Sequence, residues 1–114
     1  MNLDTLLNKL DTAPSSIEFT DTLAVIEALY NFTPTAFKNG ESENAAGQNN
    51  GSCKLFAFAR LQGLSKEQTL ACFGAYYRKD VLENPNGTDH DNIRNFMKYG
   101  WDGITYAGVA LKAL

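Results

Sequence analysis

The stretch Ser52–Leu61 (SCKLFAFARL) decides the fold, because its apolar residues cover most of the circumference of a helix drawn through it. Those residues are Leu55, Phe56, Phe58, Ala59 and Leu61. A helix that is apolar on nearly every side is normally buried, so we predict that this segment is the central helix of the core. Ser52 is expected to cap its start, and Gly63 is well placed to end it.

Two helices are predicted before this central segment. Leucines that recur three and four residues apart form one helical face between Asn2, the expected cap, and Pro14. Ser15 and Glu18 have the spacing of a capping box, which predicts a second helix from this point. That helix should end near Asn31, a few residues before the next proline.

A fourth helix is predicted after the central one. Ser65 and Gln68 have capping-box spacing, and apolar residues at helical spacing follow them. The helix is expected to continue through Tyr77 and to tolerate Gly74 at a cost of about 1 kcal/mol relative to alanine. Tyr76 and Tyr77 point about 100° apart on such a helix, so at most one of the two rings can be fully buried.

A fifth helix is predicted after a turn at residues 84–87 (NPNG). Thr88 or Asp89 is expected to cap it, and Gly100 is expected to end it.

The remaining segments have weaker patterns. Residues 33–51 are rich in glycine and asparagine and are predicted to form one long loop, which in a compact domain is often functional. Residues 103–106 suit a short strand paired near residues 32–37, and residues 107–114 suit a last short helix. We therefore predict a mainly α-helical fold, with about five helices and a short two-stranded β element in a single domain spanning residues 1–114.

Composition excludes several classes of function. The chain has 114 residues, a net charge of −3 and a pI of about 5.0, which argues against a nucleic-acid or anionic-membrane surface. No apolar run approaches the ~20 residues of a membrane span, and the first residues lack the pattern of a signal peptide. The two cysteines are expected to be reduced thiols in a cytoplasmic protein.

Four strings together resemble the HopJ type III effector family. They are Thr33–Gly40 (TPTAFKNG), Gly51–Ala59 (GSCKLFAFA), Thr69–Arg78 (TLACFGAYYR) and Asp89–Trp101 (DHDNIRNFMKYGW). The resemblance extends from about Ile17 to Leu111. It implies a small, mostly helical bacterial protein whose family is named after an effector that a type III secretion system delivers into host cells, with a role in virulence. It brings no catalytic residues with it.

The first candidate site is the string Gly47–Lys54 (GQNNGSCK), where a glycine-rich loop enters a predicted helix. Cys53 would lie near the helix N-terminus, where the pKa of a thiol falls. The string resembles the nucleophile region of papain-like cysteine proteases, which implies Cys53 as nucleophile, Gln48 as oxyanion donor and His90 as base. Ordinary turn, cap and packing roles are the alternative.

The same loop is also a candidate anion-binding site, because free N–H groups and the helix dipole favour negative charge. The residues expected to contact such a ligand are Asn44, Asn49, Asn50 and Lys54.

The second candidate site is Asp89–Asn92 with Arg94. Asp80 and Glu83 precede it, and its oxygen atoms and imidazole could hold a divalent cation; ordinary helix-start roles are the alternative. Asp89 and Arg94 are the residues singled out as ligand contacts here. Tyr76 and Trp101 are added as interaction residues, because tyrosine and tryptophan dominate binding hot spots. No metal site and no cofactor is predicted.

Three functions follow in order of preference. The first is a non-catalytic protein that binds a host or bacterial protein partner, without nucleic acid or membrane. The second is a small cysteine hydrolase that uses Cys53 and His90. The third is a metal- or anion-binding domain. The expected location is the bacterial cytoplasm, with secretion into a host cell implied by the family resemblance.

Overall fold

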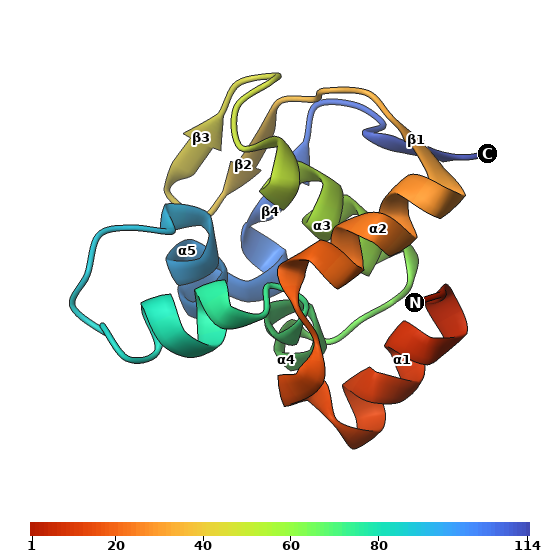
Figure 1. Cartoon of the computed structure of the whole chain (residues 1–114). Coiled ribbons are helices and arrows are strands. Elements are labelled where there is room, and N and C mark those ends of the chain that lie inside the picture. The colour runs from red at the N-terminus through yellow and green to blue at the C-terminus, as the bar shows by residue number, and fades with distance from the viewer.

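Helix α3 (Asn50–Leu61) runs through the centre of the molecule, with the other elements around it (Figure 1). The structure is a computed structural model that describes all 114 residues. Leu55, Phe56, Phe58 and Ala59 of α3 are buried, which confirms its predicted place in the core, whereas Leu61 at its end is exposed. The Phe56 ring lies at the centre of the aromatic packing and contacts the rings of Phe37, Phe73, Phe96 and Trp101.

The first two helices begin differently from one another. The start of α1 (Leu3–Thr12) is capped as predicted, because the Asn2 side chain accepts a hydrogen bond of 2.8 Å from a backbone N–H of the first turn. The predicted capping box for α2 (Phe19–Leu29) is wrong. Residues 14–16 form a 3-10 turn that contains the predicted cap, and Glu18 caps α2 instead.

The predicted fourth helix is split in two. Helix α4 (Lys66–Ala71) starts with the expected capping box, but the chain leaves the helix at Gly74, whose φ is +62°. A Cβ atom on Gly74 would lie 2.7 Å from the backbone nitrogen of Phe19, so only glycine allows this approach to the start of α2. The chain resumes as a π-helix, η2 (Tyr76–Val81).

Residues 33–51 are not one loop, as the sequence analysis predicted. They contain an antiparallel hairpin of β2 (Phe37–Asn39) and β3 (Ser42–Asn44). Strand β4 (Ile104–Tyr106) pairs with the other edge of β2, so the predicted strand and its approximate partner are confirmed. Strands of three residues carry too few alternating side chains to give a sequence pattern.

The C-terminal segment is a strand rather than the predicted helix. Strand β5 (Leu111–Ala113) pairs antiparallel with β1 (Tyr30–Phe32). The two strands of this small sheet therefore come from segments far apart in sequence. Tertiary pairing has overridden local helix propensity here. The molecule therefore contains five α-helices, one π-helix and two 3-10 turns with two small antiparallel sheets.

The last α-helix, α5 (Asp91–Tyr99), lies against the three-stranded sheet. Its predicted caps, Thr88 and Asp89, are wrong, because the residue before the first turn is His90. Gly100 ends α5 with a φ of +63°, as predicted, and a 3-10 turn, η3 (Gly100–Gly103), leads into β4. None of the helices combines the length and apolar character that crossing a bilayer requires.

The close approach at Gly74 gives a test with a matched control. Gly63 has nearly the same φ, +67°, but a Cβ atom there would contact nothing. Gly63→Ala should cost about 1 kcal/mol for the left-handed backbone alone. Gly74→Ala should cost about 3 kcal/mol or more, because the methyl group also displaces backbone atoms. Urea unfolding measures both, and equal costs would show that the contact with α2 is unimportant.

Candidate functional site

A cleft of about 330 Å³ opens where the start of α3 meets the start of α5. Its lining includes three aromatic side chains, Phe19, Phe73 and Tyr76. The Phe19 ring packs against the rings of both Phe73 and Tyr76. The rest of the lining comes from the starts of the two helices, and it consists of Asn49, Gly51, Ser52 and residues 90–93. A concave site with an aromatic wall and a few convergent polar groups is the usual form of a small-molecule site.

The two helix starts share an unusual geometry. Asn49 and His90, the residues before the first turns, both have a left-handed backbone. Their φ and ψ angles are 52° and 49° for Asn49, and 51° and 49° for His90. Neither side chain caps its helix. The backbone N–H groups of Gly51, Ser52 and Asn92 therefore find no acceptor within the chain. In the cleft these donors are available to an acceptor on a ligand.

A cluster of asparagine side chains holds the starts of α3 and α5 to the hairpin. The Asn92 carboxamide accepts from Asn44 at 3.2 Å and from Asn39 at 3.1 Å, and donates to Asn44 at 3.0 Å. Asn49 extends the cluster by donating to Asn44 at 2.6 Å. Asn39, Asn44 and Asn92 are buried. The cluster explains why the Asn49 side chain is turned away from capping α3.

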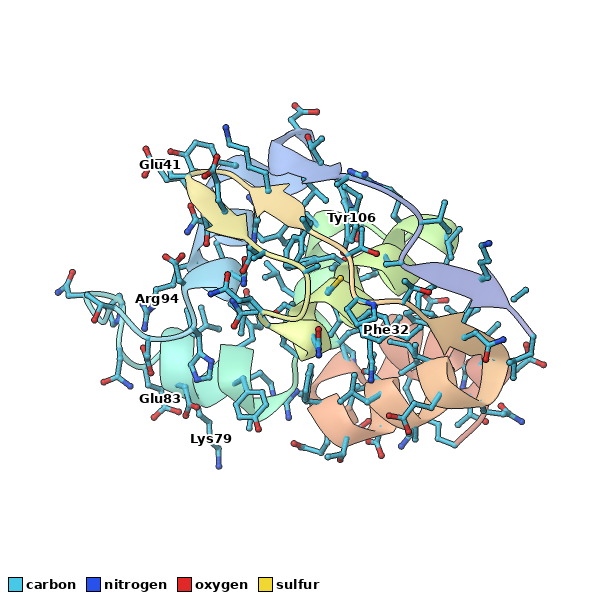
Figure 2. The ribbon with its side chains drawn as sticks, turned by 90° about the horizontal axis from the view of Figure 1, so that it is seen from above. Phe32, Glu41, Lys79, Glu83, Arg94 and Tyr106 are labelled. Carbon is cyan, nitrogen blue, oxygen red and sulfur yellow. The ribbon has the colours of Figure 1, made fainter.

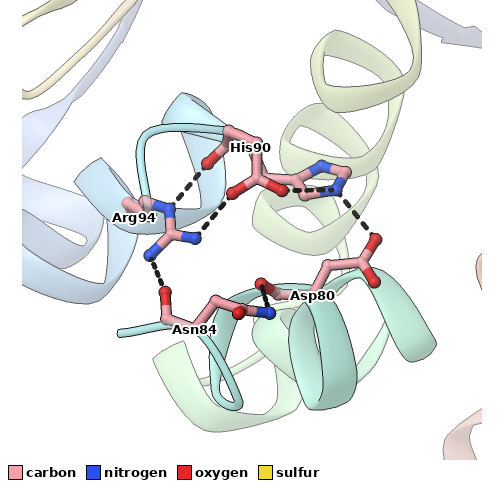
Figure 3. A network of polar contacts seen from close by, with 5 residues as sticks. Asp80, Asn84, His90 and Arg94 are labelled. Carbon is pink, nitrogen blue, oxygen red and sulfur yellow. Dashed lines mark hydrogen bonds and ion pairs between the residues drawn. The ribbon is translucent and has the colours of Figure 1, made fainter. Parts of the chain in front are cut away.

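The His90 side chain is held by the π-helix. Its Nε2 lies 3.0 Å from the Asp80 carboxylate, and its ring packs 5.1 Å from the Tyr76 ring. Tyr76 and Asp80 are four residues apart on η2, so one turn of this element both orients the imidazole and supplies part of the aromatic wall. Figure 3 shows the His90 ring and Asp80 facing each other across the gap between η2 and α5.

The loop before α5 is fixed by Arg94 (Figure 3). The guanidinium donates to the Asn84 carbonyl at 2.9 Å, to the Asp89 carbonyl at 2.6 Å and to the Asp89 carboxylate at 2.7 Å. The hydrogen bond from Arg94 lowers the pKa of the Asp89 carboxyl below its ordinary value. Both residues were predicted as ligand contacts, and the structure engages both in holding this loop.

The structure does not bring the predicted hydrolase residues together. Cys53 is the fourth residue of α3, not the first, and its buried sulfur contacts the Thr35 carbonyl at 3.5 Å. Burial raises the pKa of this thiol, which is the opposite of the activation expected at a helix start. Gln48 accepts from the Ala45 N–H in a turn, and the hydrogen-bond partner of His90 is Asp80.

The other predicted contacts are divided between the cleft and distant places. Asn49 and Tyr76 line the cleft, Asn44 supports it from the buried cluster, and Asn50 is exposed in the first turn of α3. Two residues lie elsewhere. Lys54 pairs with Glu27 at 3.7 Å, and the indole N–H of the partly buried Trp101 donates to the Leu64 carbonyl at 3.0 Å.

Sequence reasoning missed several residues of the cleft. Phe19 and Phe73, which line the cleft, were not singled out, and neither was Asn39, which lies in the cluster beside it. Asn92 was named only as part of a string. The asparagines at the ends of β2 and β3 and at the start of α5 were the available signal, because a buried asparagine needs partners. No group of three or more His, Cys, Asp or Glu side chains is arranged to hold a metal ion.

The environments of the two cysteines predict slow alkylation in the native protein. Burial raises the pKa of Cys53, and it raises the pKa of Cys72 to about 12. At pH values near ~8.5, where a free thiol is half ionised, both thiols should therefore react with iodoacetamide at least about tenfold more slowly than in urea. Mass spectrometry resolves the two sites. Reaction of native Cys53 at the unfolded rate would contradict the structure.

Comparison with known proteins agrees with the fold and the sequence strings. The family model described as HopJ type III effector protein matches residues 3–111. A solved structure described as "Crystal structure of unknown function protein VPA0580" is 55% identical, with a TM-score of 0.97. The match covers 100% of this chain and 95% of that one. No curated protein matches the sequence. The chain belongs to the HopJ type III effector family.

Proposed function

We propose that this protein is a non-catalytic binding protein that holds a small ligand in the cleft between the starts of α3 and α5. The observation that carries the proposal is the cleft itself, which is lined both by aromatic side chains and by two uncapped helix starts. Its volume of about 330 Å³ lies at the small end of the range for ligand sites.

The walls of the cleft select the chemistry of the ligand. The N–H groups of Gly51, Ser52 and Asn92 are donors, so the ligand needs a carboxylate, phosphate or carbonyl oxygen opposite them. Phe19, Phe73 and Tyr76 favour an apolar, preferably flat, body on the other side. The Asp91 carboxylate also lines the cleft, which favours a ligand of low charge over a polyanion.

The arrangement supports binding rather than chemistry. The buried thiol of Cys53 lies outside the cleft, and its raised pKa keeps it protonated. The His90 imidazole is held by Asp80 and Tyr76 at the edge of the cleft, where it can donate or accept a hydrogen bond. The family description extends the proposal to the place of action, which is the bacterial cytoplasm or a host cell reached by type III secretion.

A fragment screen tests the proposal. Aromatic carboxylates and aromatic amides are titrated into ¹⁵N-labelled protein, and aromatic amines without an acceptor oxygen serve as the control series. The carboxylates and amides should shift the amide signals of Gly51, Ser52 and Asn92, and the amines should not. Absence of shifts there, or equal shifts by the amines, would contradict the proposal, and consumption of a fragment would contradict its non-catalytic part.

A pair of variants localises the binding. Tyr76→Ala removes a half-exposed ring from the cleft wall and should weaken a bound fragment about tenfold. Leu61→Ala removes an exposed apolar side chain outside the cleft and should leave the affinity unchanged. Equal affinities for the two variants would place the fragment elsewhere.

A further inference from the structure

We propose that His90 determines the ligand preference of the cleft between the starts of α3 and α5, a role that rests on the proposed binding function. While its imidazole is protonated, the cleft prefers a carboxylate over a neutral carboxamide, and this preference fades as the ring loses its proton. His90 is the one histidine of the chain, and it lines this cleft. No lysine or arginine lines the cleft, so the His90 ring is the one lining side chain that can carry a positive charge.

The two ring nitrogens of His90 have different surroundings. Nε2 lies 3.0 Å from the Asp80 carboxylate and 3.9 Å from the Asp89 carboxylate, so in the neutral ring the proton belongs on Nε2 (Figure 3). Nδ1 has no hydrogen-bond partner within the chain. A neutral ring therefore offers a ligand an acceptor at Nδ1, whereas a protonated ring offers a donor.

This difference separates two classes of ligand. The oxygen atoms of a carboxylate only accept hydrogen bonds, so a carboxylate can pair with Nδ1 only while the ring is protonated. A carboxamide both donates and accepts, so it can pair with either form of the ring. Protonation of His90 therefore favours the carboxylate and leaves the carboxamide nearly unaffected.

The His90 ring is fixed in position and still open to solvent. The Tyr76 ring packs 5.1 Å from it and the Asp80 carboxylate contacts its edge, and both residues belong to η2. The His90 side chain is 30% exposed, so the ring can exchange protons with water without leaving its place. A ligand therefore meets an imidazole that is already oriented.

The charges around the ring oppose a carboxylate ligand while the ring is neutral. Asp80 faces the ring from η2, Asp89 from the preceding loop, and Asp91 follows it in α5 and lines the cleft. Arg94 of α5 pairs with Asp89 at 2.7 Å and offsets that charge. Protonation of His90 offsets the charge of Asp80, because the two groups are in direct contact.

The remaining surroundings of the ring bring no further charge into the cleft. The lining residues from α2 and α3 are Phe19, Asn49, Gly51 and Ser52, none of which is charged. Figure 2 shows Lys79 and Glu83, the nearest charged residues on either side of Asp80 in sequence, on the same side of the molecule as Arg94. Neither forms an ion pair with His90. Histidine is the side chain type that normally changes its charge between about pH 5 and 8, so carboxylate binding should depend on pH in that range.

Binding of 2-naphthoate and 2-naphthamide, measured by calorimetric titration, tests the proposal. The two probes share one ring system and differ in the polar group. Naphthoate should bind about fivefold more tightly at about pH 5.5 than at about pH 8, because its carboxylate stays ionised while the His90 ring gains a charge. The affinity for naphthamide should change by less than about twofold.

The outcomes distinguish this role from the binding function on which it rests. Binding of both probes with no dependence on pH would overturn the role of His90 and leave the binding function standing. Binding of neither probe at either pH would overturn both.

A pair of variants assigns the pH dependence to His90. His90→Asn removes the titrating ring, and asparagine tolerates the left-handed backbone, φ +51°, of this position. Naphthoate should bind this variant with the same affinity at both pH values. Asp91→Asn is the matched control, because it removes a charge from the cleft and should tighten naphthoate binding at both pH values while the pH dependence remains. Retained pH dependence in a folded His90→Asn variant would overturn the proposal.

The unchanged protein gives a second readout. Its one histidine can be followed by NMR without ambiguity. Coupling between two sites is reciprocal, so saturating naphthoate should move the titration of the His90 ring to higher pH, and naphthamide should not. A titration that naphthoate leaves in place would overturn the proposal.

Discussion

The buried asparagine cluster is the constraint on which the rest of the structure depends. Asn39 and Asn44 lie on the two strands of the hairpin, and Asn92 lies in the first turn of α5. Their carboxamides hydrogen-bond one another, although the buried Oδ1 atom of Asn39 has no hydrogen-bond partner. An unsatisfied buried acceptor costs about 1–3 kcal/mol. The cluster thereby fixes where α5 begins relative to the hairpin.

The same cluster affects which hydrogen-bond donors are free in the cleft between the starts of α3 and α5. Asn49 donates its side chain to Asn44 and so leaves the first turn of α3 uncapped. His90 is engaged by Asp80 and leaves the first turn of α5 uncapped in the same way. Helix starts are ordinarily capped by their own side chains. Here both caps are used for tertiary contacts, and the donors that they would have satisfied line one cleft.

The sequence predicted the helices more accurately than the joints between them. The apolar periodicity of α1 and α3 and the capping box at Ser65 were sufficient, because these features are local. Strand β4 was predicted with an approximate partner, whereas β1 and β5 were missed because they pair with each other across most of the chain. The split at Gly74 was missed because its cause is the backbone of α2, which no local pattern records. For the candidate site, the sequence singled out a loop that lines the cleft in part, but only the fold shows that the Cys53 thiol in it is buried.

If the asparagine cluster shapes the cleft between the starts of α3 and α5, a change in the cluster should alter binding in the cleft. A substitution of Asn39 is the most direct test, because Asn39 belongs to the cluster but does not line the cleft. The affinity of a cleft-bound aromatic carboxylate is measured for Asn39→Ala and for Lys38→Ala, a substitution of the exposed neighbour on the same strand. Circular dichroism verifies that both variants are folded. We predict that Asn39→Ala binds about tenfold more weakly and that Lys38→Ala binds as the unchanged protein does. Full affinity in a folded Asn39→Ala variant would contradict the account.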